Sequence, residues 1–189
     1  GKTSVASFYQ QIISMLGFSS ASIGTIGIIS NVAQSEFQDY SELTTPGLIE
    51  LRQILDKMHS LKIDNVIMEV SSHGLKQARV AGIKFQAAAF TSFSQDHLDY
   101  HGDMEDYLAS KLILFNSLLK TGSVAVINSD MNVSERVINK CNSKQHRVLT
   151  YGLNGKYIKV LSIKHVNVGS IVEFELEREK HEIVLNLLG

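Results

Sequence analysis

The amino-acid sequence predicts an α/β fold: a doubly wound, mostly parallel sheet with a small antiparallel β appendage at its C-terminal end. Short apolar runs that suit buried strands alternate along the chain with segments whose apolar residues recur at helical spacing. That alternation is typical of β-α-β units, in which helices cover both faces of a parallel sheet. After Lys156 the period changes, and Val172, Phe174 and Leu176 alternate with glutamates, as in half-exposed antiparallel strands.

Composition limits the class of protein. The chain has 189 residues, 44% of them hydrophobic, which is enough to bury one core. The formal net charge is −1, so we expect no general attraction to nucleic acid or to an anionic membrane. No apolar run is long enough to span a membrane and no leader opens the chain, which favours a cytoplasmic protein.

The single cysteine and the two chain ends carry further expectations. Cys141 excludes an internal disulfide, and its polar neighbours predict a surface thiol. Because residue 1 is Gly and residues 185–189 stop on an apolar run, we expect a domain of a longer protein.

The first element predicted is an amphipathic helix that follows a G-K-T segment. Such a segment ends a phosphate-binding loop, in which Lys2 would reach the β and γ phosphates of a nucleotide and Thr3 a Mg²⁺ ion. Half of that motif is absent here, and a G-K-T segment alone also occurs by chance. The apolar face of the helix would be Val5, Phe8, Ile12 and Leu16, and Gly17 would end the helix.

Two strands are predicted next along the chain. Residues 23–29 are apolar, and Gly24 and Gly27 would let another backbone come close. Residues 66–68 form a continuous apolar run that Glu69 interrupts. Open α/β sheets place their sites at the C-terminal ends of such strands, where a buried carboxylate needs a cation or several hydrogen bonds.

A helix is predicted between these two strands. After a polar loop at 31–43, Thr45 and Pro46 match the N-cap and the first position of a helix. Capping alone would explain Thr44 and Thr45. The inner face of this helix would be Leu48, Leu51, Leu55 and Met58.

Polar residues follow Glu69. Residues 71–74 predict a small turn, and in segment 75–81 Gln77 and Arg79 could point at an anion. The alternative for Arg79 is a solvated surface arginine. The next strand, 85–93, ends just before Asp96 and His97, so two strands would deliver acids and a histidine to one edge. Downstream, a strand is predicted at 123–127, a turn at 128–130 that leads into a helix ending at Lys140, a strand at 148–151 and the β appendage at 157–188.

Lys111 is the most unusual residue of the chain. From Met104 to Leu119 the apolar residues recur at helical spacing, and Lys111 falls on their stripe. Its neighbours one turn away are Tyr107, Leu108, Leu114 and Phe115. A buried ammonium is costly, so the side chain could snorkel to water. Alternatively, its neutral amine could react with carbon dioxide to give a carbamate, whose two oxygens suit a hard cation.

Four segments together resemble a known family: G-K-T-S at 1–4, L-T-T-P at 43–46, M-E-V-S-S-H-G-L-K-Q-A-R at 68–79 and D-H-L-D-Y-H-G-D-M-E at 96–105. With Tyr107 and Lys111 they resemble the central ATPase domain of the Mur ligases. Within that family the chain is most similar to the type that adds the third amino acid to UDP-N-acetylmuramoyl-L-alanyl-D-glutamate in peptidoglycan synthesis.

The resemblance implies a domain organisation and a P-loop NTPase type of fold. Residues 1–189 would be the central ATP-binding domain, with an α/β core at 1–155 and the β appendage at 156–189. A nucleotide-sugar domain would precede it and an amino-acid domain would follow it, so the isolated fragment would be nearly inactive. The intact enzyme would be a monomer.

The resemblance also assigns roles to residues. Gly1, Lys2, Thr3 and Ser4 would bind ATP, with Lys2 on the phosphates. Thr3 and Glu69 would hold one Mg²⁺, and His97 and carbamylated Lys111 a second. The family's positions for the UDP-muramoyl dipeptide correspond to Thr44, Thr45, Ser71, Gln77 and Arg79.

Some residues of these motifs receive no such role. His73 and His101 would be structural or would support the ligands. The chain departs from the usual family pattern at Ser92, where Asn is usual, and at Gln95, where Arg is common. The D-H-L-D-Y-H core is retained.

The reaction that the resemblance implies is ATP-dependent amide formation. The γ-carboxylate of D-glutamate would attack the γ-phosphate of ATP, and the amine of a free amino acid, meso-diaminopimelate or L-lysine, would displace phosphate from the acyl phosphate. Three alternatives remain: a folylpolyglutamate synthase-like ligase, a P-loop NTPase without ligase activity, and a catalytically silent binding module. The third predicts no Mg²⁺-dependent nucleotide binding.

Overall fold

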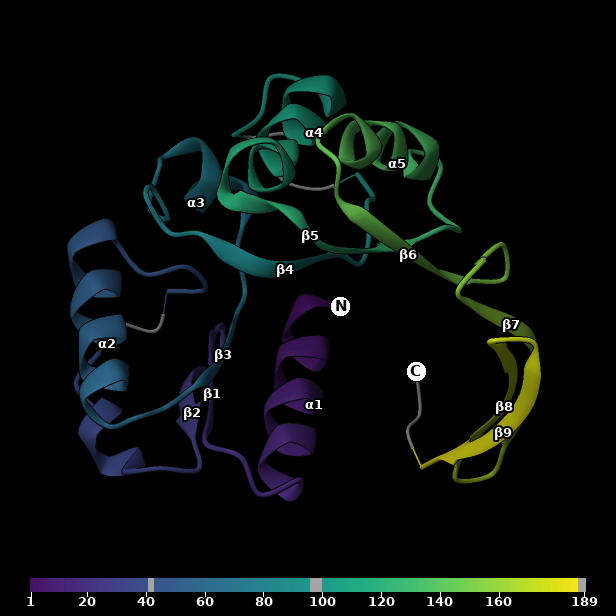
Figure 1. The fold of residues 1–189 in the computed structure, drawn as a ribbon, viewed down its shortest axis with the longest axis horizontal. Coiled ribbons are helices and arrows are strands. Elements are labelled where there is room, and N and C mark those ends of the chain that lie inside the picture. The colour runs from purple at the N-terminus through teal and green to yellow at the C-terminus, as the bar shows by residue number, and fades with distance from the viewer. Residues whose placement is uncertain (41–42, 96–99, 187–189) are drawn as a thin grey trace. The chain divides into compact units, whose positions relative to one another are not determined.

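The computed structural model describes residues 1–40, 43–95 and 100–186, which form two compact units (Figure 1). Within these ranges the first unit holds residues 1–40, 43–83 and 100–113, and the second holds 84–95 and 114–186. His97 lies outside the described residues. In the described part of the chain, no helix has the length and hydropathy needed to cross a membrane.

The first unit begins with the predicted helix, α1 (Lys2–Met15), which ends where Gly17 takes a positive φ of 85°. The face it buries differs from the prediction. Val5, Phe8 and Ile12 are 40–56% exposed, whereas Ala6 and Gln10 are buried. The side-chain amide of Gln10 donates to Ser20 Oγ, and Ser20 Oγ donates to the backbone carbonyl of Gln10. These hydrogen bonds satisfy the polar groups of Gln10 and Ser20. The face of α1 that carries Gln10 can therefore pack on the sheet, although hydropathy would not select it.

The apolar run at 23–29 forms the turn of a hairpin, so the prediction of a single strand was wrong. Strands β1 (Ser20–Gly24) and β2 (Gly27–Ser30) are antiparallel, and their register pairs Gly24 with Gly27 across the turn. Gly27 has a φ of 84°, which favours glycine next to a two-residue hairpin loop. The predicted strand before Glu69 is confirmed as β3 (Asn65–Met68), parallel to β1.

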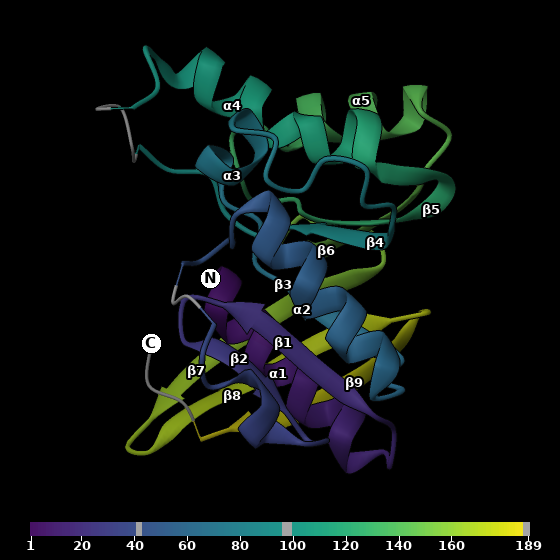
Figure 2. The ribbon, with the colours of Figure 1, turned by 90° about the vertical axis from the view of Figure 1, so that its left-hand side faces the viewer.

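Helix α2 (Leu48–Ser60) lies on the opposite face of this three-stranded sheet from α1 (Figures 1 and 2). Its N-cap is Gly47, so the predicted cap at Thr45 was wrong. The Thr45 hydroxyl donates to the backbone carbonyl of Glu69 instead. The buried face of α2 is Leu51, Ile54 and Met58. A short 3-10 helix, η1 (Gln34–Phe37), precedes it within the segment predicted as loop.

Two further helices complete the first unit. The predicted turn at 71–74 becomes the cap and first turn of α3 (Ser72–Lys76), because Ser71 Oγ accepts a hydrogen bond from the backbone N–H of Gly74. Helix α4 (Met104–Ile113) carries Lys111, and the chain continues as the π-helix η2 (Leu114–Leu118).

The second unit is built on a six-stranded sheet in which β4, β5, β6 and β7 run parallel and β7, β8 and β9 antiparallel. Its strands are β4 (Phe85–Phe90), β5 (Leu119–Asn128), β6 (Arg147–Gly152), β7 (Ile158–Val166), β8 (Gly169–Leu176) and β9 (Glu179–Leu185). The mixed α/β class with a mostly parallel sheet and antiparallel C-terminal strands is thus confirmed. The strands predicted as a β appendage continue the parallel sheet. The described strands form two sheets, whereas a single doubly wound sheet was predicted.

Helix α5 (Ser134–Ser143) packs on β5 and β6 and corrects the prediction for Cys141. Val137 and Cys141, four residues apart, both point inward and are fully buried. Burial raises the pKa of the Cys141 thiol to about 11. The predicted surface thiol is therefore a core side chain.

Candidate functional site

Glu69 lies at the centre of the polar contacts in the first unit. It follows β3 directly and is only 3% exposed. Its Oε2 accepts a hydrogen bond of 2.9 Å from the Thr3 hydroxyl, and its Oε1 accepts one of 2.9 Å from the backbone N–H of Thr25. Donors from α1 and from the β1–β2 turn thus supply the compensation that a buried carboxylate needs.

Gly24 makes room for this carboxylate. A Cβ atom at position 24 would overlap Glu69 Oε1 and would lie 2.7 Å from Glu69 Cδ, so no larger residue fits without displacing the acid. The glycines of this segment were predicted to admit another backbone. The group that Gly24 admits is instead the side chain of Glu69, which reaches across from the neighbouring strand.

Thr3 brings Glu69 to the first turn of α1. Lys2 and Ser4 lie beside it; Lys2 is exposed and Thr3 is half-buried. The first backbone N–H groups of a helix have no partner within the helix and carry a partial positive charge, so this end of α1 favours an anion such as a phosphate. The structure therefore joins Thr3 to Glu69, with Lys2 next to Thr3 in the same helical turn.

A second group of predicted residues meets at the backbone of Glu69. Thr45 is 1% exposed, and its Oγ1 lies 3.0 Å from the Glu69 carbonyl, 3.0 Å from the Ser71 amide and 3.2 Å from the Ser71 hydroxyl. These bonds join the loop before α2 to the turn before α3. Thr45 and Ser71 therefore connect these two segments through their hydrogen bonds. We call this pair of residues the Thr45–Ser71 seam.

Arg79 extends this seam. Its Nη1 donates to the Thr45 carbonyl at 2.9 Å, while Nε and Nη2 donate to Gln77 Oε1 at 2.9 and 2.6 Å. Such fixed contacts contradict the alternative of a freely solvated arginine. Thr44 joins the group through a 3.0 Å contact between its hydroxyl and that of Thr25. All five residues predicted for substrate binding therefore lie within one hydrogen-bonded cluster.

Lys111 is half-buried on α4, less enclosed than its apolar neighbours had predicted. Its Nζ lies 4.6 Å from the centroid of the Tyr107 ring, a cation–π geometry in which the side chain lies along an aromatic face. The described residues contain no group of three or more His, Cys, Asp or Glu side chains that could hold a metal.

His101 has a structural environment, in line with the prediction. It is fully buried, with Nε2 2.9 Å from Ser72 Oγ on α3 and Nδ1 3.3 Å from Asp106 on α4. A hydrogen bond from Lys76 lowers the pKa of Asp106, and His101 adds to this effect. His73 lies against the ring of Tyr100 at 4.0 Å between centroids. The contacts of His101 thus help to bind α3 to α4.

Thr25 is the residue of this site that sequence reasoning missed. It lies in the hairpin turn, where its N–H binds Glu69 and its hydroxyl contacts Thr44. The only signal for it is its place in a Gly-Thr-Ile-Gly segment, and the assignment of residues 23–29 to one strand concealed the turn.

The donors present fit a magnesium ion. Mg²⁺ prefers oxygen ligands and is commonly held by one or two carboxylates together with substrate phosphates. Thr3 and Glu69 offer a hydroxyl and a carboxylate 2.9 Å apart. Because the Thr3 proton is donated to Glu69, the remaining lone pairs of the hydroxyl are available to a cation.

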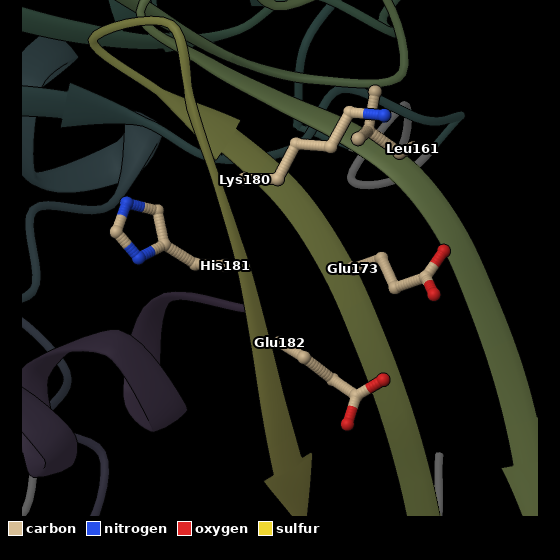
Figure 3. Close-up of a pocket in the computed structure, with 5 residues that line it drawn as sticks. All are labelled: Leu161, Glu173, Lys180, His181 and Glu182. Atoms are coloured by element: carbon tan, nitrogen blue, oxygen red, sulfur yellow. The ribbon is translucent and has the colours of Figure 1, made fainter.

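A depression of the surface lies on β7, β8 and β9 of the second unit (Figure 3). It is lined by Leu161, Glu173, Lys180, His181 and Glu182. The Ser162 hydroxyl donates to Glu173 at 2.7 Å. None of the predicted site residues lines this depression.

Comparison with known proteins identifies the family of this chain. The family model described as the Mur ligase middle domain matches residues 1–189. UDP-N-acetylmuramoyl-L-alanyl-D-glutamate--2,6-diaminopimelate ligases from Brucella melitensis biotype 1 and Rhizobium meliloti are each 40% identical over 189 residues, 100% of this chain and 38% of theirs. The chain therefore spans under two fifths of the length of these relatives.

Solved structures give the same picture. A structure of a UDP-N-acetylmuramoyl-L-alanyl-D-glutamate--2,6-diaminopimelate ligase matches with a TM-score of 0.83 and 26% identity, over 98% of this chain and 37% of that one. The Thermotoga maritima MurF ligase in complex with ADP (TM-score 0.67, 14% identity, 97% of this chain and 38% of that one) and an FPGS–AMPPCP complex (0.64, 13%, 95% and 49%) share the fold. This chain belongs to the Mur ligase family, as a middle domain.

Proposed function

We propose that the full-length protein is an ATP-dependent ligase that adds the third amino acid to UDP-N-acetylmuramoyl-L-alanyl-D-glutamate. The observation that carries this proposal is the position of Glu69, which is hydrogen-bonded to the first turn of α1 on one side and to the Thr45–Ser71 seam on the other. The activity named for relatives 40% identical favours diaminopimelate over lysine as the added amino acid.

The chemistry of amide formation explains why ATP and the dipeptide would both bind near Glu69. A carboxylate does not accept an amine at neutral pH, because an oxide ion is a very poor leaving group. Transfer of the ATP γ-phosphate to the D-glutamate γ-carboxylate gives an acyl phosphate and ADP, and attack by the amine then expels phosphate. Both steps bring anions together, so positioning and charge neutralisation carry the catalysis.

Lys2 and the first turn of α1 would hold the ATP phosphates. The Lys2 side chain is exposed at the helix start, and the free N–H groups there add partial positive charge without requiring a further side chain. Gly1 and Ser4 belong to the same turn and would contact the nucleotide through their backbone and hydroxyl groups.

Thr3 and Glu69 would hold one Mg²⁺, which would neutralise the phosphate charge during transfer. We assign His97 and a carbamate of Lys111 to a second Mg²⁺. The half-buried position of Lys111 against Tyr107 supports this assignment, because it limits the freedom of the side chain. A charged ammonium would repel a cation, whereas a carbamate would add negative oxygen ligands.

The dipeptide would lie on the cluster of Thr44, Thr45, Ser71, Gln77 and Arg79. Arg79 is held by Gln77 and by the Thr45 carbonyl, so its guanidinium is already oriented before an anion arrives. A fixed guanidinium recognises a carboxylate or phosphate better than a flexible one. We expect the enzyme to act as a cytoplasmic monomer, without nucleic-acid or membrane partners.

The test is an assay of the purified full-length protein. ADP release should require ATP, Mg²⁺, the UDP-muramoyl dipeptide and diaminopimelate together, and mass spectrometry should detect the tripeptide product. Nucleotide hydrolysis that does not depend on the dipeptide would contradict the proposal and would favour a simple NTPase. Ligation of glutamate to a folate would favour the folylpolyglutamate synthase type, whose fold the chain shares.

A further inference from the structure

We propose that Thr25 is a positioning residue that couples the acid Glu69 to Thr44 and makes Thr44 a hydrogen-bond acceptor toward the substrate. This inference rests on the proposed function. It adds the chemical class of the group that Thr44 recognises: an N–H or O–H donor of the dipeptide substrate, not one of its carboxylates or phosphates.

The geometry places Thr25 between the two residues. Its backbone N–H donates to Glu69 Oε1 at 2.9 Å, and its hydroxyl lies 3.5 Å from Glu69 Oε2 and 3.0 Å from the Thr44 hydroxyl. The 3.5 Å distance from the Thr25 hydroxyl to Glu69 Oε2 exceeds the usual range of an O–H···O hydrogen bond, so this contact is weak. The backbone N–H of Thr25 holds the acid, and its hydroxyl links the acid to Thr44.

Either threonine hydroxyl can be the donor in the 3.0 Å contact, and we assign the direction from the carboxylate at one end of the chain of contacts. An ionised carboxylate only accepts hydrogen bonds, and a hydroxyl has a single proton to donate. If Thr25 donates its proton toward Glu69, its oxygen accepts the proton of Thr44. Thr44 then has only lone pairs left, and it accepts a hydrogen bond from the substrate.

The hairpin turn fixes these positions. The β1–β2 register pairs Gly24 with Gly27 around Thr25, and Gly24 is in close contact with the Glu69 carboxylate. Thr25 itself is exposed, so a bound substrate would cover it and exclude the water that competes for its hydroxyl. The coupling should therefore be strongest in the substrate complex.

The experiment uses the full-length enzyme with Thr25→Val, which removes the hydroxyl and keeps both the shape of the side chain and the backbone N–H. We expect the KM for the dipeptide to rise about fivefold, the effect of one modest hydrogen bond, with the KM for ATP unchanged. Thr25→Ser should restore the KM. The matched control is Thr121→Val, an exposed threonine of β5 in the second unit.

Substrate analogues and a double variant test the direction of the chain. An analogue in which one amide N–H of the dipeptide is N-methylated should lose affinity for the wild type and lose less for Thr44→Val. The double variant Thr25→Val with Thr44→Val should cost no more than Thr44→Val alone. Additive losses, or an unchanged KM in Thr25→Val, would overturn the inference. If the wild-type enzyme itself shows no ligation, the proposed function fails instead.

Discussion

The two compact units of this chain use their residues differently. In the first unit the strands are short, and polar side chains of helix starts and loops bond to one another across large sequence separations, as Thr3 does to Glu69 and Thr45 to Ser71. In the second unit the strands are longer, and apolar residues such as Phe90, Ile127 and Val137 fill its interior. Its described depression is lined by residues of neighbouring strands.

The difference teaches where function and stability lie in this domain. The polar contacts around Glu69 in the first unit hold the β1–β2 turn and the segments before α2 and α3, so a substitution there should alter activity before it alters folding. Both units bury apolar side chains, but the predicted site residues that the structure describes all lie in the first unit. A substitution in the apolar interior of the second unit should therefore alter stability and leave activity intact.

The largest effect should come from Lys111→Ala in the full-length enzyme. If the Lys111 carbamate holds a metal, its loss should lower kcat by about a hundredfold or more. Formate or acetate should restore part of the rate, because a small carboxylate can replace the lost oxygen ligands. Lys111→Arg, which keeps a charge and cannot form the carbamate, should stay inactive. Full activity of Lys111→Ala would contradict the carbamate assignment.

Gly24→Ala should have the next largest effect. The added Cβ would overlap Glu69 Oε1, so the acid must leave its position. We expect kcat to fall by about tenfold or more and the free energy of unfolding by about 1–3 kcal/mol, since overpacking strains the hairpin. Gly102→Ala is the control, because a Cβ there meets no atom within 4 Å. Equal activities of the two variants would show that the space at Gly24 is unimportant.

Arg79→Ala should weaken binding of the dipeptide and leave binding of ATP unchanged. In the part of the chain that the structure describes, the guanidinium donates to the Thr45 carbonyl and to Gln77. We expect the KM for the UDP-muramoyl dipeptide to rise about tenfold or more, as for the loss of a hydrogen bond to a charged group. The KM for ATP should stay close to the wild-type value. An unchanged dipeptide KM would exclude the role proposed for Arg79.

Cys141→Ser should give the smallest effect on activity and a clear effect on stability. A hydroxyl in this fully buried position would add polar surface to the core, so the free energy of unfolding should fall by about 1–3 kcal/mol while kcat is unchanged. Because burial raises the pKa to about 11, the native thiol should not react with thiol reagents at a mildly alkaline pH. Rapid labelling of the folded protein would contradict the buried position.

Several features were predictable because they depend on local pattern. The helix after G-K-T, the strand before Glu69 and the change of period after Lys156 all follow from spacing over a few residues. The hydrogen bonds of Glu69 were predictable too, since a buried carboxylate at the end of an apolar strand needs partners.

Other features depended on contacts between distant residues. Gly47, not Thr45, caps α2, because Thr45 is bound to Glu69 and Ser71 across the unit. The inward face of α1 is set by the bonds between Gln10 and Ser20, which no hydropathy pattern contains. The burial of Cys141 required the position of α5 on the sheet.

By itself, the sequence determined the order of most helices and strands, the α/β class and the residue types of the first turn of α1, because propensity and periodicity act over a few neighbouring positions. The tertiary structure alone decided that residues 23–29 form a hairpin turn, that Gly24 admits Glu69 and that Thr25 joins the acid to Thr44. The last two choices are made by contacts between residues 19 to 45 positions apart, Thr25 with Thr44 and Gly24 with Glu69, whose partners no local pattern specifies.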